Sequence, residues 1–279
     1  MDDEAAATER LRAALDRPDE AVDLAAAALL LAELSGDHPD AHGSIQILDE
    51  LGTGLRSRLG AAPLLDSAAD ALARYLGYTV GFRGNEDDYY DPANSYLDIV
   101  LRRRIGLPIT LSVVYIDVGR RAGLDVRGIG FPGHFIVGVY ASDSVRYLDP
   151  FRRGLALARS DLEAQLHRIY GRAMPLRRAM VQPATSGDII VRMLRNLKHA
   201  YLRRNDTQQA LRATSRLRAL QPDDVGELCD HAVLLVQRGQ WQAAKQELST
   251  FLQVRPQGAD VPSVRELLAM VETVRRTMN

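Results

Sequence analysis

The C-terminal part of the sequence repeats with a period of 34 residues, and this repeat restricts the fold more than any other feature. Six pairs stand in register: Tyr201 and Leu235, Leu202 and Val236, Asn205 and Gly239, Ala210 and Ala244, Leu217 and Phe251, and Pro222 and Pro256. The register gives each repeat a small residue where two helices cross, a turn former between them and a proline after the second helix. We therefore predict two helical hairpins within residues 188–279, closed by a last helix from about Val261 to Arg276.

A period of this length is typical of tetratricopeptide repeats, which stack so that their helices expose a concave face. Such a face can bind a peptide or a protein partner. The same helices can instead act only as a structural support for another domain, and the sequence leaves both interpretations open.

The overall composition is that of an ordinary globular protein. Of the 279 residues, 46% are hydrophobic and 25% are charged, which rules out wholesale disorder. The 35 basic and 36 acidic side chains leave a net charge of −1, so the chain carries no strong positive field. Nucleic acids and anionic membrane surfaces are attracted mainly by such a field, and we expect neither as a partner.

Cysteine content and the N-terminus indicate a cytoplasmic protein. Cys229 is the single cysteine, which excludes an internal disulfide and any zinc site built on several thiolates. The N-terminus is acidic, unlike a secretory signal, and the apolar run from Leu24 to Ala32 is too short to span a bilayer. His38 and His42 have no further ligand in register, so we expect no metal, and no motif implies a cofactor. No feature specifies an oligomeric state.

Hydrophobic spacing divides the chain before the repeats into two parts. Residues 1–84 carry apolar side chains at three- and four-residue intervals, which predicts a helical layer packed on a core. In residues 85–180, a short helix from Tyr96 to Arg104 precedes a second helix that starts at Pro108 and ends before Gly123.

Three runs with strand character follow these helices: Val126–Phe131, His134–Tyr140 and Val145–Leu148. The polar turn at residues 141–144 predicts a hairpin between the last two runs. We thus expect a central helix covered by a small antiparallel sheet.

This arrangement would bring three chemical groups together. His134 opens one strand and Asp149 closes the next, so the two lie side by side if the hairpin forms. The carboxylate would then fix the imidazole tautomer, and a nucleophile between Pro108 and Thr110 would gain from the helix dipole. A partly buried histidine satisfied by a strand-end aspartate is the simpler interpretation, and spacing alone favours it.

Several segments of the chain resemble the SirB-type proteins, which join a transglutaminase-like core to C-terminal tetratricopeptide repeats. The matching segments are Tyr89–Leu97 (YYDPANSYL), Val100–Ser112 (VLRRRIGLPITLS), Gly119–Leu124 (GRRAGL), Gly130–Phe135 (GFPGHF) and Leu148–Phe151 (LDPF). With the repeats, the resemblance covers most of the chain from about residue 85 onward.

The resemblance implies a papain-like, transglutaminase-like fold, in which a cysteine at a helix N-terminus works with a histidine and an aspartate to make and break acyl bonds to amides. His134 and Asp149 fall where that histidine and aspartate stand. The cysteine has no counterpart, because its position falls near Ile109 or Thr110 and Cys229 lies among the repeats.

Two hydroxyl residues could replace the missing thiol. Thr110 or Ser112 would need His134 within about 2.6–3.2 Å of its oxygen, because a hydroxyl requires a dedicated base. The alternative is structural: Thr110 caps or bonds back within its own helix, and Ser112 packs as a small residue under the sheet.

Four further residues are candidates for ligand binding. Arg102, Arg103 and Arg104 could receive a carboxylate or phosphate through bidentate hydrogen bonds, although a solvated helix end explains such a run more simply. Asn94 lies in an Asp-Pro-Ala-Asn-Ser turn. We interpret this segment first as a turn in which Asn or Ser caps the N-terminus of the next helix.

We therefore predict an α+β fold, mostly helical, with a transglutaminase-like core, a small antiparallel sheet and tetratricopeptide-like hairpins. The predicted function is a protein-interaction or regulatory module on a degenerate scaffold, binding a protein or peptide through the repeats and the remnant cleft. The alternative is an amide hydrolase or acyl transferase that uses a Thr or Ser nucleophile with His134 as base and Asp149 as orienter.

Overall fold

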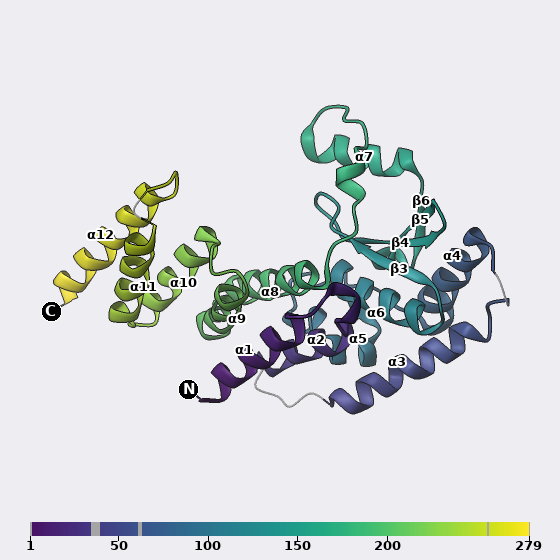
Figure 1. Cartoon of the computed structure of the whole chain (residues 1–279), viewed down its shortest axis with the longest axis horizontal. Helices are drawn as coiled ribbons and strands as arrows, with labels where there is room; N and C mark the ends of the chain where they lie inside the picture. Colours follow the sequence, from purple (N-terminus) through teal and green to yellow (C-terminus); the bar gives the residue numbers. More distant parts are fainter. Residues whose placement is uncertain (1, 35–39, 61–62, 256, 279) are drawn as a thin grey trace. The chain divides into compact units, whose positions relative to one another are not determined.

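The computed structural model describes residues 2–34, 40–60, 63–255 and 257–278. The chain divides into two compact units. One consists of Ala13–Met193, and the other joins Met1–Arg12 to Leu194–Asn279. Figure 1 shows the helices and strands of both units.

A buried helix, α6 (Pro108–Arg121), forms the centre of the first unit. Its many β-branched residues also allowed a strand, but the segment forms a helix, as Pro108 at its start and Gly123 after its end predicted. Pro108 occupies the first helical turn, where its missing N–H is not needed. Gly123 follows the helix with φ of 91°, and the N–H of Leu124 bonds to the carbonyl of Gly119 at 2.9 Å, which is a Schellman ending.

An antiparallel sheet packs against α6. Its strands lie in the order β3 (Asp125–Ile129), β4 (Ile136–Ala141), β5 (Ser144–Asp149) and β6 (Leu155–Leu157). The predicted β4–β5 hairpin is present, with Ala141 paired to Ser144. The prediction that His134 opens a strand is wrong, because a turn with Gly133 at φ of 68° and a bond from His134 N to Phe131 O places it before β4. Strand β6 was not predicted, because three residues are too few to show an alternation of apolar and polar side chains.

Short helices enclose α6 and the sheet. These elements are η1 (Asp19–Ala21), α2 (Leu24–Leu29), η2 (Leu30–Leu34), α3 (Ala41–Arg56), α4 (Leu65–Arg74), the π-helix η3 (Tyr75–Val80), η4 (Pro92–Asn94), α5 (Leu97–Arg103), η5 (Pro150–Arg152), α7 (Arg159–Tyr170) and η6 (Arg178–Val181). The two-residue strands β1 (Arg83–Gly84) and β2 (Ile105–Gly106) pair in parallel. Helices α2, α3 and α5 contact α6, so that α6 is buried on nearly every face.

The repeat region is helical with the predicted register. It consists of α8 (Ser186–Arg203), which begins in the first unit, and then α9 (Thr207–Leu220), α10 (Val225–Gln237), α11 (Trp241–Val254) and α12 (Val261–Met278). The N-terminal helix α1 (Asp2–Leu15) belongs mainly to the same unit.

The paired positions of the repeat behave alike. Asn205 and Gly239 both adopt a left-handed backbone, with φ of 57° and 73°, at the turn between helices. Ala210 and Ala244 are both fully buried, which lets the helices of each hairpin approach closely. Pro256, the partner of Pro222, lies outside the described residues, as does His38.

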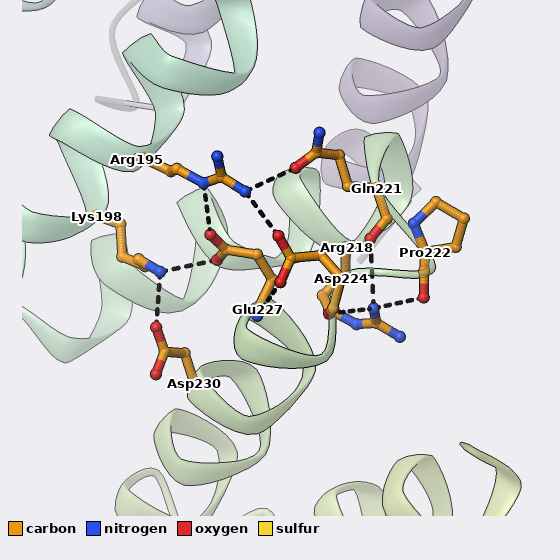
Figure 2. A network of polar contacts seen from close by, with 8 residues as sticks. All are labelled: Arg195, Lys198, Arg218, Gln221, Pro222, Asp224, Glu227 and Asp230. Atoms are coloured by element: carbon orange, nitrogen blue, oxygen red, sulfur yellow. Dashed lines mark hydrogen bonds and ion pairs between the residues drawn. The ribbon is translucent and has the colours of Figure 1, made fainter. Parts of the chain in front are cut away.

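A buried ion-pair network joins α8 to α10. Figure 2 shows the carboxylate of Glu227 held between Lys198, at 2.8 Å, and Arg195, at 2.9 Å. Lys198 also donates to Asp230 at 2.7 Å, and Arg195 to Asp224 at 2.7 Å. Burial alone would lower the pKa of Lys198, but its hydrogen bonds to Asp230 and Glu227 raise the pKa above the ordinary value. The network therefore holds a lysine cation inside the repeat unit.

Candidate functional site

The centre of the candidate site is an imidazole–carboxylate pair. Nε2 of His134 lies 3.0 Å from Oδ1 of Asp149, and their side chains are 16% and 3% exposed. Asp149 ends β5 and its carboxylate also accepts from the N–H of Phe151 at 3.1 Å, which fixes its orientation. Nδ1 of His134 has no hydrogen-bond partner among the described residues. The pair therefore leaves one defined ring nitrogen free to meet another group.

Aromatic rings surround this pair. The ring of Phe151 stands edge-on to His134 with centroids 6.4 Å apart, and Tyr89 packs on Phe151 at 6.0 Å. Gly84 lets the Phe151 ring lie against the backbone, because a Cβ there would meet the ring at 2.4 Å. On its other side, Phe151 lines a hollow of about 430 Å³ together with Arg83, Glu86, Asp87, Arg152 and Arg153.

The two candidate hydroxyls lie in the first turns of α6, and neither bonds to His134. Thr110 is fully buried and its Oγ1 has no hydrogen-bond partner, so it does not cap or bond back as the structural interpretation expected. Ser112 does bond back, because its Oγ donates to the carbonyl of Pro108 at 2.8 Å. The geometry needed for a hydroxyl nucleophile, an oxygen in contact with His134, is absent for both residues.

The three consecutive arginines each bond to a group of the protein. Arg102 pairs with Asp98 and Arg103 with Asp91, both at 3.0 Å. Arg104 ends α5 with φ of 59° and donates to the carbonyl of Val80 at 2.9 Å. These contacts favour the interpretation of the run as a helix end over a site for an external anion.

Asn94 is fully buried and organises the loop that precedes α5. Its Nδ2 donates to the carbonyls of Asp88, at 2.8 Å, and Tyr89, at 3.3 Å, and its Oδ1 accepts from Nδ2 of Asn85 at 3.0 Å. The predicted Asn or Ser cap of α5 is wrong: the cap residue is Tyr96, and Asp91 caps η4 instead. Because every polar atom of the Asn94 amide is engaged, its role in this structure is to hold Tyr89 in place.

Arg192 also lies at this site, although no sequence motif points to it. This α8 residue donates from Nη2 to the carbonyl of His134 at 2.9 Å, and its guanidinium lies 5.3 Å from the centroid of the Phe135 ring. Burial lowers its pKa, whereas the nearby Tyr89 hydroxyl acts in the opposite direction. No spacing in the sequence links residue 192 to residue 134, so only the tertiary structure reveals the contact.

The repeat unit carries its own surface feature. A hollow of about 520 Å³ opens between the α9–α10 connection and α11. It is lined by Arg218, Pro222, Asp223, Ala243, Gln246, Glu247, Thr250, Phe251, Val254 and Arg255. Burial acts to raise the pKa of Glu247, but hydrogen bonds from His231 and Arg218 outweigh it and lower the pKa below the usual range. A carboxylate therefore stays charged at the wall of a partly apolar hollow.

The described residues contain neither a metal-binding cluster nor a membrane-spanning helix. No group of three or more His, Cys, Asp or Glu side chains with metal-binding geometry occurs within residues 2–34, 40–60, 63–255 and 257–278. Over the same ranges, no helix is long and apolar enough to cross a membrane.

Comparison with protein families supports both parts of the resemblance, the transglutaminase-like core and the repeats. Residues 44–195 match the transglutaminase-like superfamily, and residues 197–269 match the tetratricopeptide repeat. These matches agree with the combination of core and repeats that the resemblance to SirB-type proteins predicts.

Individual relatives extend this result. A UPF0162 protein of Xylella fastidiosa is 35% identical over 252 residues, which cover 88% of this chain and 89% of the relative. A UPF0162 protein of Vibrio cholerae is 30% identical over 188 residues, 67% of this chain and 69% of the relative. F-box only protein 21 of Mus musculus is 38% identical over 74 residues, 26% of this chain and 12% of that protein. No solved structure matches the chain. The chain therefore belongs to the UPF0162 proteins, a family with a transglutaminase-like domain followed by tetratricopeptide repeats.

Proposed function

We propose that this protein is a cytoplasmic interaction or regulatory module that binds peptide segments of a partner protein. In this proposal the transglutaminase-like domain keeps the His134–Asp149 pair as part of a binding surface and no longer forms acyl-enzyme intermediates. The single cysteine supports the cytoplasmic location, because the chain is built without disulfides. Tetratricopeptide repeats support the binding role, because repeats of this kind generally mediate contacts between proteins.

The observation that carries the proposal is that neither the cysteine nor the two candidate hydroxyls is placed to act as a nucleophile. Cys229, the chain's one thiol, lies on α10, and burial raises its pKa, which disfavours the thiolate. Thr110 is fully buried, so a substrate carbonyl has no access to its hydroxyl. Ser112 already donates its proton to Pro108. Neither candidate hydroxyl is therefore placed to act as a nucleophile beside the positioned imidazole of His134.

The hollow on α11 is the surface that we assign to the repeats' partner. Val254 is 75% exposed at its edge, and Phe251 is partly buried beside it. Arg218, Arg255 and Glu247 supply polar groups around these side chains. Apolar anchors bordered by charged groups are typical of peptide-binding sites, where the anchors supply affinity and the polar groups fix register.

We expect Val254→Gln to weaken peptide binding about tenfold. Peptides are first selected by display on the full chain, and their dissociation constants are then measured by fluorescence anisotropy. Val254 loses apolar contact with the peptide, and a tenfold change corresponds to about 1.4 kcal/mol. Met270→Gln on α12 is the matched control, because Met270 is also exposed (60%) but lies outside the hollow. Equal losses in both variants, or none in either, would contradict the assignment of this surface.

One observation favours a second function. With Asp149 at Nε2, His134 has a carboxylate beside one ring nitrogen and a free Nδ1, which an amide hydrolase or acyl transferase could use as its base. Thr110 would then be the nucleophile, and its unpartnered buried hydroxyl would need to become exposed and reach Nδ1. This function requires a movement of α6 or of the His134 turn, whereas the binding function uses the structure as it stands.

A further inference from the structure

Arg192 is a partly buried cation without a carboxylate partner among the described residues. Its guanidinium donates a hydrogen bond to the His134 carbonyl and packs on the Phe135 ring. By contrast, Arg102, Arg103 and Arg195 each pair with an acidic side chain. One donated bond leaves most of the five N–H groups of the Arg192 guanidinium for other acceptors.

The acidic group at the site does not neutralise Arg192. The Oδ1 of Asp149 lies 3.0 Å from Nε2 of His134 and accepts from the N–H of Phe151, and its Oδ2 lies 3.7 Å from Arg152. Taking a cation out of water without a counter-charge is costly, and burial accordingly lowers the pKa of Arg192. An anion brought by a ligand would remove this cost, so the structure is arranged to gain from binding one.

The surroundings of Arg192 indicate where the ligand lies. The guanidinium lies against Gly130 on one side, where a Cβ would be only 3.3 Å from Nη1, so a ligand would approach from another side. Tyr89 is close enough to Arg192 to influence its charge, and its ring, 42% exposed, packs on Phe151 beside His134. A ligand bound here would meet a cation, an aromatic ring and an imidazole in one place.

We infer that Arg192 binds a carboxylate of a peptide ligand, at its C-terminus or on an acidic side chain, while Tyr89 and Phe151 contact the neighbouring residue. This inference rests on the proposed function and names the chemical class of its ligand. One guanidinium matches the single charge and planar fork of a carboxylate. A phosphate dianion needs more positive charge than one guanidinium supplies. Arg152, the other arginine near the His134–Asp149 pair, does not supply it because it faces Asp149.

The test compares two ligands that differ only in charge, using the full chain. N-acetyl-Ala-Tyr with a free carboxylate and its C-terminal amide are titrated while the Nε–Hε signal of Arg192 is followed by NMR. We expect the acid to bind at least tenfold more tightly than the amide and to shift the Arg192 signal. N-acetyl-Glu-Tyr-amide tests the side-chain source, and binding by either carboxylate supports the inference.

Variants and a competing anion complete the test. Arg192→Gln should reduce the ratio of acid to amide affinity to about one, whereas the matched change Arg172→Gln, at an exposed residue, should leave it unchanged. Equal affinity of the wild-type protein for acid and amide would overturn the inference even if Arg192→Gln fails to fold. A ratio that survives in folded Arg192→Gln would overturn it as well, and so would tighter binding of inorganic phosphate than of the acid.

Failure of this inference can be told apart from failure of the proposed function. The repeat surface is tested at Val254 and the carboxylate site at Arg192, and the two residues lie in different compact units. A loss of peptide affinity in Val254→Gln together with equal binding of acid and amide would refute only the role of Arg192.

Discussion

Lys198→Met lowers the free energy of unfolding of the repeat unit by about 2–3 kcal/mol, because the buried carboxylate of Glu227 loses one of its two cationic partners and keeps only Arg195. The side chain of Lys198 is only 4% exposed and its ammonium bonds to Glu227 and Asp230. Methionine keeps the length and apolar stem of lysine, so the change removes the charge with little loss of packing. Urea unfolding followed by circular dichroism measures the effect.

The chain provides its own control for this variant, because Lys245 is its only other lysine. Lys245 pairs with Glu272 at 2.7 Å, but the two side chains are 38% and 37% exposed. Lys245→Met should therefore change the stability by less than about 1 kcal/mol. If the two methionine variants are equally stable, the Lys198 network does not hold α8 against α10.

Asn94→Ala should destabilise the first unit by about 3 kcal/mol. The change removes one hydrogen bond from each of three groups, the carbonyls of Asp88 and Tyr89 and the amide of Asn85, and each lost bond costs about 1 kcal/mol. Thermal unfolding of the full chain, followed by near-ultraviolet circular dichroism, reports the loss. The Tyr89 ring should also lose its fixed environment.

Gln46→Ala is the control for Asn94, since it also removes a side-chain amide in a hydrogen bond. Gln46 donates to Glu50 at 3.0 Å on the exposed face of α3, so its loss should have almost no effect on stability. A stable Asn94→Ala protein that has lost peptide affinity would instead make Asn94 a ligand-binding residue and contradict the structural role.

The fold was predictable where local signals and periodicity agree. Pro108 and Gly123 identified α6 as a helix despite its β-branched residues, and the turn at 141–144 identified the β4–β5 hairpin. The 34-residue register located turns whose left-handed residues, Asn205 and Gly239, now occupy equivalent conformations. These features depend on residues close in sequence, so the sequence carries them directly.

Less of the site was predictable, because it depends on contacts between distant segments. The hairpin placed His134 near Asp149, although the turn at Gly133 moves His134 off the strand. Thr110 and Ser112 lie in α6 as expected, but their hydroxyl contacts depend on packing: Thr110 does not bond back within the helix as predicted, and buried Ser112 does. Arg192, which is 58 residues from His134, has no local signature at all.

In the proposed function the first unit binds its partner and does not form acyl intermediates. The most direct test of this proposal is intact-mass spectrometry of the full chain after incubation with hydroxyl-directed acylating probes, with Thr110→Ala, Ser112→Ala and His134→Ala as folded comparison variants. We predict no label that depends on His134, because neither hydroxyl contacts the imidazole. Stoichiometric labelling that disappears in His134→Ala and in one of the two hydroxyl variants would contradict the claim and establish an enzyme.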